Sequence, residues 1–285
     1  MAINVFAPAK VNLSLHITGQ RADGYHLLDS LVAFAPVGDR LVLSAGQGFT
    51  MSVDGPEGAG VPVDDSNLAL RGARLVSENG VHIALTKDLP AAAGIGGGSS
   101  DAAAAIRGAC ALFDAPMPDE GAILSLGADV PMCMTPVPAR ATGIGGELER
   151  VTLPRLPAVL VNPRVPVSTP SVFRSLTRRD NPPMPDVPAF AGVSDAIAWL
   201  ADQRNDMQAA AIAIEPMVAS VLDALGETGA ALSRMSGSGA TCFGLYPTDA
   251  AAAEAGAAIA AAHPGWWVRA TWLGDVSEMA VPQVA

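Results

Sequence analysis

An α+β fold in two domains is predicted by the order of the expected elements and by the size of the chain. Strand-like and helix-like segments are mixed along the 285 residues, without the regular strand–helix alternation of a parallel sheet. This length suits one large domain or two of ordinary size, and half of the residues are hydrophobic, which is enough to build a substantial core. We expect a first domain at 1–150 and a second at 151–285, because a proline-spaced, strand-like segment begins near this boundary.

The first half of the chain predicts a strand-rich domain with three helices. Apolar alternation and short apolar runs predict strands at 4–6, 11–17, 27–35, 39–44, 81–87 and 132–135. Helical spacing predicts helices at 67–78, 100–113 and 121–127, the first of which ends before Gly80. The segments 19–24 and 54–65 are rich in Gly, Asp and Pro, which is typical of loops.

The second half predicts fewer strands and longer helices. The segments 148–163 and 266–273 are strand-like, and 181–188 is a proline-rich loop. Helices are expected at 195–202, 206–225 and 249–262, and a hairpin is expected where SGSG joins 230–235 to 240–246.

Charge and targeting patterns exclude several classes of protein. The net charge of −11 argues against a nucleic-acid partner, which requires a basic face, although a local pocket can still bind an anionic substrate. The three cysteines form no CxxC pair, which argues against a disulfide framework or a zinc site. No signal-peptide pattern and no apolar run of about 18 residues occurs, so we expect a soluble cytoplasmic protein with no membrane partner.

The segment LPAAAGIGGGSSDAAAA, at 89–105, predicts a phosphate-binding loop. It places glycines between an expected strand and an expected helix, where free backbone N–H groups and the positive end of the helix dipole point at one place. Ser99 or Ser100 could cap the helix or contact phosphate oxygens. The alternative is a glycine-rich turn that only allows close helix packing.

Two familiar nucleotide loops do not fit this segment. A Walker A loop requires a lysine followed by Ser or Thr, and the loop contains no lysine. The dinucleotide pattern GxGxxG fits Gly94 and Gly96, but its third glycine falls on Ser99. The loop is therefore of another kind. Lys10 and Lys87 are the only lysines among the 17 basic residues, which draws attention to both.

The segment PAAAGIGGGSSDAA, at 90–103, resembles the second motif of the GHMP small-molecule kinases. APAKVNLSLHITGQRADGYHLLDSLV (7–32) and SRMSGSGATCFGLY (233–246) resemble the first and third motifs and follow in the family's order. The first motif and GADVP (127–131) are most similar to one member, which acts in the non-mevalonate isoprenoid pathway on an alcohol linked to cytidine diphosphate.

The resemblance implies a fold and an activity. The fold would be a ribosomal-protein-S5-like N-terminal domain followed by a ferredoxin-like α+β C-terminal domain. The activity would be ATP-dependent phosphorylation of the 2-hydroxyl group of the cytidine diphosphate-linked alcohol. The implied cofactors are ATP and Mg²⁺, and the protein ligands of the metal cannot be assigned, because no counterpart is evident for the glutamate that other members use.

The resemblance also implies the catalytic pair. Asp129 matches the proposed base, although an aspartate between Gly and Pro more commonly stabilises a turn or caps a helix. Lys10 would lower the pKa of that base, or steady the attacking oxygen and the γ-phosphate, and its alternative is a surface lysine at a strand edge. Asn12 faces the same side of the strand as Lys10 and could bond the substrate polyol, or could be an ordinary strand-edge amide. The expected ATP loop comprises Pro90, Ala91, Ala92, Ala93, Gly94, Ile95, Gly96, Gly97, Gly98, Ser99 and Ser100.

The remaining expected contacts concern the nucleobase and the diphosphate. An aromatic face stacks on a base and an imidazole bonds its polar edge, so Tyr25 and His26 could read cytosine. The alternative is a tyrosine packed on its loop beside a solvated histidine. The resemblance implies a second stacking face from Phe173 and a position near the diphosphate for Thr169. Gly237 and Gly239 would lie by the phosphates and substrate, or would only form the hairpin turn.

Three other functions remain open. A GHMP kinase for a sugar or an amino alcohol would have no use for a base-stacking pair. A nucleotide-binding regulator without catalysis would not require both Lys10 and Asp129. A dinucleotide oxidoreductase is disfavoured by the broken GxGxxG pattern.

Overall fold

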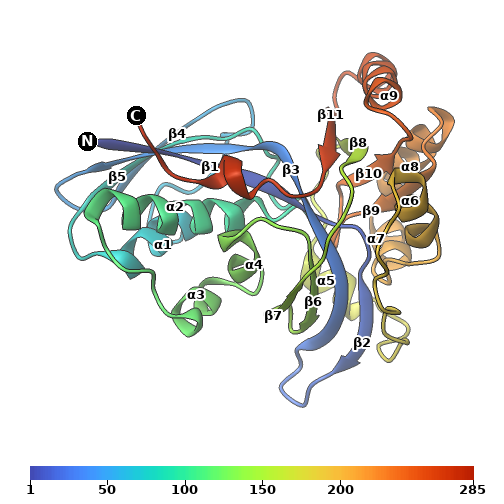
Figure 1. The fold of residues 1–285 in the computed structure, drawn as a ribbon, viewed down its shortest axis with the longest axis horizontal. Helices are drawn as coiled ribbons and strands as arrows, with labels where there is room; N and C mark the ends of the chain where they lie inside the picture. Colours follow the sequence, from blue (N-terminus) through green and yellow to red (C-terminus); the bar gives the residue numbers. More distant parts are fainter.

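The computed structural model describes all residues from Met1 to Ala285, and it confirms the expected α+β class (Figure 1). An eight-stranded sheet dominates the first half and follows the order β12–β1–β3–β5–β4, with β2 and β6 also paired to β3, and β7 to β6. Pairing is antiparallel except between β4 and β5. The strands are β1 (Ala2–Asn12), β2 (His16–Gln20), β3 (His26–Ala45), β4 (Thr50–Asp54), β5 (Val81–Thr86), β6 (Ala139–Gly143), β7 (Glu147–Arg150) and β12 (Gln283–Val284).

Helices α1 and α2 pack together over this sheet, with α3 and α4 beside them (Figure 1). Small residues allow the close approach, since a Cβ on Gly72 of α1 would lie 2.8 Å from the Ala102 carbonyl oxygen of α2. The side chain of Asn67 caps α1 by accepting a hydrogen bond from the N–H of Ala69. The bounds are α1 (Leu68–Val76), α2 (Gly97–Phe113), α3 (Glu120–Leu126) and α4 (Val130–Met134).

The second half forms a four-stranded antiparallel sheet of order β11–β8–β10–β9. The predicted hairpin is confirmed as the pair β9 and β10. The strands are β8 (Leu156–Asn162), β9 (Leu232–Met235), β10 (Cys242–Leu245) and β11 (Trp267–Leu273), and the helices are α5 (Thr169–Arg174), α6 (Val193–Ala201), α7 (Gln208–Ile214), α8 (Met217–Glu227) and α9 (Asp249–Ala262).

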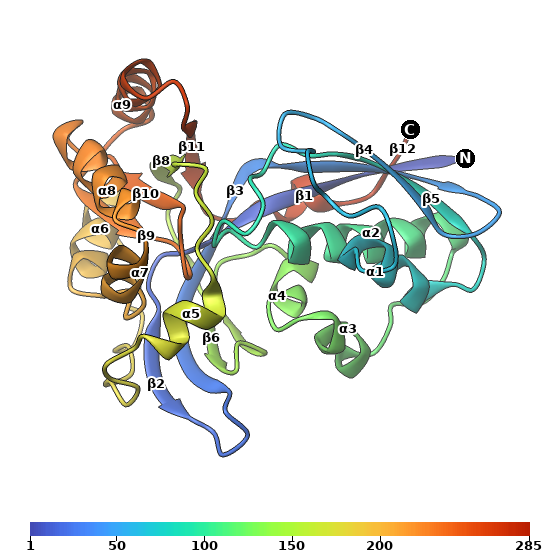
Figure 2. The same cartoon turned by 180° about the vertical axis from the view of Figure 1, so that it is seen from behind.

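The two halves are joined by a continuous core and by the end of the chain. One buried cluster includes Val11 and Leu31 of the first sheet together with Leu160 and Phe243 of the second. After β11 the chain returns to the first half through the short 3₁₀ helix η1 (Ser277–Ala280), and β12 pairs with the edge of β1 (Figure 2). The division at residue 150 stays a prediction, and the last residues lie on the first sheet.

Several expected elements differ from the structure. The expected strand 11–17 is interrupted between β1 and β2, the expected strands 27–35 and 39–44 form the single strand β3, and the segment 148–163 is divided between β7 and β8. The expected strand 132–135 is the helix α4, because Pro131 stands in the first turn, where its fixed φ and missing N–H are tolerated. The expected helix 206–225 is divided into α7 and α8 next to Pro216, which cannot donate a helical hydrogen bond. α2 begins at Gly97 rather than at residue 100, because the glycines themselves form its first turn.

No single helix is long and apolar enough to cross a membrane. The pair α7 and α8 has that length and composition only when both are counted together, and the two helices meet at a 119° bend.

Candidate active site

Lys10, Asn12 and Asp129 meet at the end of β1. The Lys10 Nζ lies 3.1 Å from Asp129 Oδ2 and donates a hydrogen bond of 2.9 Å to Asn12 Oδ1. The side chains of Lys10 and Asn12 lie on the same face of β1, as their spacing of two residues predicts. Lys10 is only 4% exposed, whereas the Asp129 side chain is 41% exposed. A buried ammonium group is therefore held against a carboxylate that solvent, or a bound substrate, can reach.

The Asp129 side chain does not cap a helix. The residue occupies the position before α4, but its carboxylate makes no capping hydrogen bond there. It reaches Lys10 on β1 instead, 119 residues earlier in the chain. The capping alternative for Asp129 is therefore wrong.

The glycine loop between β5 and α2 contacts both Lys10 and the third motif. The Lys10 backbone N–H donates to the Ile95 carbonyl at 3.0 Å, and the Ser236 hydroxyl donates to the Gly94 carbonyl at 2.9 Å. A Cβ on Gly96 would lie 3.1 Å from Lys10 Cε, so this glycine leaves room for the lysine side chain. The structure thus brings together the first motif, which contains Lys10, the glycine loop of the second motif and the turn of the third motif.

The two loop serines differ in their surroundings. Gly96 precedes α2 with a left-handed φ of 66° and provides no side-chain cap. The Ser100 hydroxyl is buried and donates to the Pro8 carbonyl at 2.7 Å, while Ser99 is half-buried. The expectation that a serine caps α2 is wrong, because the glycines form the helix start. The first N–H groups of α2 remain available to an anion.

The other members of the expected ATP loop vary in exposure. Ala91, Ala92 and Gly98 are exposed, and Gly94, Gly96 and Gly97 are half-buried. Pro90, Ala93 and Ile95 are buried and anchor the loop in the protein interior.

A buried ion cluster beneath the loop escaped the sequence analysis, although Lys87 stood out as one of two lysines. Lys87 Nζ donates to Asp101 Oδ2 at 2.8 Å and pairs with Asp39, whose other oxygen accepts the N–H groups of Asp88 and Leu89. Burial, with the Asp39 charge, raises the pKa of Asp101 to about 8. Burial opposes the charge on Lys87, but the two carboxylates outweigh it and raise its pKa. This cluster ties β3, the end of β5 and the first turn of α2 together.

Asp101→Asn is expected to remove a pH dependence of stability. An unfolded aspartate loses its proton near pH 4, whereas Asp101 in the folded protein keeps it to about pH 8. Between these values the folded state binds one proton more, so this group lowers stability as the pH rises. Urea unfolding across this window should show a fall for the wild-type chain that is reduced in Asp101→Asn. The exposed Asp223→Asn is the control, and parallel profiles for wild type and Asp101→Asn would contradict the expectation.

The expected nucleobase residues lie on both sides of the junction between the halves. The His26 ring on β3 stacks on Phe173 of α5, with 4.4 Å between the ring centroids. This spacing leaves no room for a base between the two rings. Tyr25 is 61% exposed at the end of the β2–β3 loop, directly before β3. The Thr169 hydroxyl lies 2.6 Å from the Ser238 hydroxyl, which places the start of α5 against the third motif.

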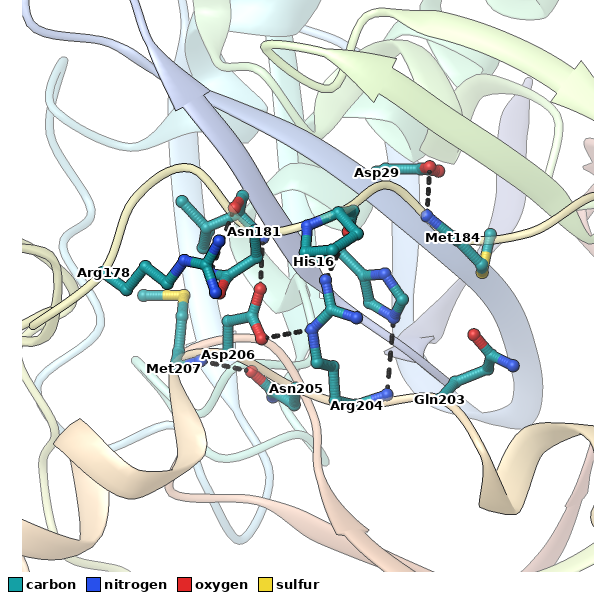
Figure 3. A network of polar contacts seen from close by, with 12 residues as sticks. His16, Asp29, Arg178, Asn181, Met184, Gln203, Arg204, Asn205, Asp206 and Met207 are labelled. Atoms are coloured by element: carbon teal, nitrogen blue, oxygen red, sulfur yellow. Dashed lines mark hydrogen bonds and ion pairs between the residues drawn. The ribbon is translucent and has the colours of Figure 1, made fainter.

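A polar network beside β2 includes His16, Arg204 and Asp206 (Figure 3), and the neighbouring Asn205 supports the third motif. The Asn205 amide donates to the carbonyls of Met235 and Gly237 at 2.7 and 2.8 Å. Asp206 accepts the backbone N–H of Ile17, and the backbone N–H of Arg204 donates to His16 Nε2. Gly237 approaches Gly94 so closely that a Cβ would lie 2.9 Å from its carbonyl oxygen. Gly239 has a left-handed φ of 88° in the same turn. None of the Arg204–Asp206 contacts was predicted, because nothing in the local sequence marks them.

Two family patterns and many named relatives match this chain. The family pattern "GHMP kinases N terminal domain" matches residues 67–138, and "GHMP kinases C terminal" matches residues 187–265. Proteins named 4-diphosphocytidyl-2-C-methyl-D-erythritol kinase are 54% identical in Ruegeria pomeroyi, over 94% of this chain and 98% of the relative, and 53% identical in Roseobacter denitrificans, over 99% and 97%.

Solved structures agree with this result. A crystal structure of 4-(cytidine 5'-diphospho)-2C-methyl-D-erythritol kinase is 34% identical, with a TM-score of 0.78 over 95% of this chain and 99% of the other. A homoserine kinase from Cytophaga hutchinsonii, at 20% identity, has the same fold with a TM-score of 0.70 over 100% and 97%. The GHMP kinase fold predicted from the motifs is therefore confirmed. This chain belongs to the GHMP kinase family.

Proposed function

We propose that this chain transfers the γ-phosphate of ATP to the 2-hydroxyl group of 4-diphosphocytidyl-2-C-methyl-D-erythritol, in the methylerythritol phosphate route to isoprenoid precursors. The observation that carries the proposal is the pairing of buried Lys10 with half-exposed Asp129 beside the glycine loop. The relatives named for this activity, at about half identity over nearly the whole chain, support the choice of substrate.

Phosphoryl transfer requires an oriented nucleophile and positive charge at the phosphate. In our proposal Asp129 accepts the proton of the substrate hydroxyl, whose oxygen forms a bond to the γ-phosphorus as the bond to the bridging oxygen of ADP breaks. Lys10, 3.1 Å from Asp129, stabilises the charge on the attacking oxygen and the γ-phosphate. Asn12 holds the Lys10 ammonium group through its side-chain oxygen, and its amide nitrogen donates to the Ser30 hydroxyl at 2.8 Å, so a contact with the substrate polyol would have to replace one of these bonds.

The phosphates of ATP would lie at the N-terminus of α2, where the backbone of residues 97–99 presents N–H groups and only small side chains. Mg²⁺ would neutralise phosphate charge there. The structure has no group of three or more His, Cys, Asp or Glu side chains arranged for a metal ion. Mg²⁺ usually keeps several waters and binds through one or two carboxylates with substrate phosphates, so in our proposal the ATP phosphates and water would supply most of its ligands, and Asp129 stays free to act as the base.

The cytidine end of the substrate would contact Tyr25, His26 and Phe173. Because His26 and Phe173 stack directly on each other, a base that used the inner face of Phe173 would have to separate the two rings. Thr169 would lie by the diphosphate, next to the turn that contains Gly237 and Gly239.

Phe173→Ala is expected to raise the KM for the cytidyl substrate by about 5- to 100-fold, which corresponds to the loss of one base-stacking contact. The KM for ATP should change little, because the glycine loop is built from other elements. Steady-state ADP release at varied concentrations of each substrate measures both constants. Phe190→Ala is a matched control, since Phe190 packs with Trp199 and Leu200 in the shared core. Equal effects of the two substitutions on the cytidyl KM would contradict a nucleobase role for Phe173.

The decisive test of the proposal is ADP release against a panel of acceptors. The cytidyl alcohol should support turnover, whereas free methylerythritol phosphate, mevalonate and homoserine should not. Turnover with mevalonate or homoserine at a comparable kcat/KM would establish another GHMP kinase activity instead.

A further inference from the structure

Arg107 is a buried cation without a carboxylate partner. It lies in the middle of α2, and its guanidinium group donates only to backbone carbonyl oxygens. Nη1 donates to Cys133 at 2.7 Å, Nη2 to Phe6 at 3.0 Å and Nε to Ala280 at 3.1 Å. Burial lowers the pKa of Arg107 to about 10, so the group is still charged at neutral pH. Burying a charge is costly unless its hydrogen bonds are satisfied, and here they join three separate segments.

The three segments include both elements that carry the proposed catalytic pair. Phe6 belongs to β1, the strand of Lys10, and Cys133 belongs to α4, the helix that follows Asp129. With five residues, α4 is too short to be stable without tertiary contacts. One end of α4 meets β1 through the Asp129–Lys10 pair, and the other end meets β1 through Arg107. The guanidinium group also binds the free carbonyls at the C-terminal end of α4, where a cation is favourable.

The third segment is the end of the chain, residues 274–285, which comes back from the second half. Its Ala280 carbonyl accepts the Nε–H of Arg107, and the Val276 N–H donates to the Pro136 carbonyl just after α4. Val276 packs in the same buried cluster as Val130 and Cys133 of α4. Figure 1 shows this segment crossing from β11 to the outer edge of β1 past α2. It therefore covers one side of the guanidinium group and supplies the acceptor for its Nε–H.

We infer that Arg107 is a positioning residue for phosphoryl transfer, which holds α4 against β1 so that Asp129 faces Lys10. The inference rests on the proposed role of Asp129 as the base. Arg107 itself does not touch the phosphate or the acceptor in this arrangement. Its removal would let α4 turn away from β1, which would lengthen the distance between the carboxylate and the ammonium group.

The test is a double-mutant cycle between Arg107→Met and Asp129→Asn, read as single-turnover rates and as separate KM values. Arg107→Met alone should lower the rate by about 10- to 100-fold, the scale expected when a catalytic group is misplaced by about 1 Å. Both KM values should stay within about threefold, because the glycine loop and the cytidine residues are left in place. In the Asp129→Asn background the further loss should be less than about threefold, since a positioning residue has nothing left to position.

Arg234→Met is the matched control. Arg234 is also a buried arginine bound only to carbonyls, those of Leu13, Leu200 and Gln203, and burial lowers its pKa to about 10 as well. It contacts neither α4 nor residues 274–285. Arg234→Met should therefore lower the rate by the same factor in the wild-type background and in the Asp129→Asn background.

The possible outcomes distinguish a wrong role for Arg107 from a wrong role for Asp129. If the losses from Arg107→Met and Asp129→Asn multiply, Arg107 has only a structural role and the inference is overturned. If Asp129→Asn alone keeps a near-normal rate, the proposed base is wrong. Should Arg107→Met not fold, Arg107→Lys replaces it in the cycle, because it keeps the charge and the apolar stem but lacks the planar fork. It should show a smaller loss that again disappears without Asp129, and a loss that persists there overturns the inference.

Discussion

Asp129→Asn is expected to lower the single-turnover rate of phosphoryl transfer by about a hundredfold to ten-thousandfold, the usual contribution of a positioned general base. The amide keeps the size of the side chain but cannot take the hydroxyl proton. Lys10→Met should cause a loss of similar size, because it removes the cation that lies 3.1 Å from the carboxylate. Rapid-quench measurement of ADP, with enzyme in excess over ATP, separates this chemical step from product release.

A capping aspartate in the same region is the control for this experiment. Asp119 precedes α3, and its side chain accepts the N–H of Ala122 at 2.8 Å. Asp119→Asn preserves the shape of that cap and leaves the Lys10–Asp129 pair untouched, so its rate should stay near that of the wild type. Near-normal rates in both Asp129→Asn and Lys10→Met would refute the mechanism.

Gly94→Ala is expected to disrupt the junction between the glycine loop and the third motif. A Cβ there would lie 2.4 Å from the Ser236 carbonyl oxygen, and Gly94 has a left-handed φ of 73°. The left-handed backbone costs a non-glycine residue about 1–2 kcal/mol, and the forced backbone shift adds about 1–3 kcal/mol. Urea unfolding should show a loss of this size. The KM for ATP should rise at least about tenfold, because the displaced loop no longer presents its N–H groups to the phosphates.

Gly98→Ala is the stability control within the same loop. Its Cβ would meet only Leu68 Cδ1, at 3.8 Å, and Gly98 already lies in the first turn of α2. Alanine suits a helix better than glycine by up to about 1 kcal/mol, so this variant should be as stable as the wild type or more stable. Equal unfolding midpoints for the Gly94 and Gly98 variants would contradict the proposed backbone contact.

Local sequence patterns predicted much of this fold because they report local periodicity. The alternation in 81–87 and the helical spacing in 249–262 correspond to β5 and α9 with little change. The short segment 132–135 was assigned wrongly, because a few apolar residues fit a strand and a buried helical turn equally well. Strand β12 was not predicted, since two exposed residues carry no period and pair with β1 only because the chain end returns to it.

The chemistry of the site was also largely predictable, whereas its connections were not. Residue types and motif order indicated a phosphate loop, a lysine and a carboxylate, because each is recognisable within a few neighbouring residues. The Lys87–Asp39–Asp101 cluster, the stack of His26 on Phe173 and the carbonyl acceptors of Arg107 join residues 14 to 173 positions apart. Their pairing depends on how the sheets and helices pack, and no spacing along the chain specifies it.

The sequence alone therefore predicted the family and the α+β class, both of which are confirmed, and it named the groups that we propose for phosphoryl transfer. Folding decided which of these groups lie together. Asp129 could have capped a helix, and it faces Lys10 because α4 packs against α2 next to the end of β1. Contacts of this kind form between elements distant in sequence, where burial removes water and makes each charge depend on its partner.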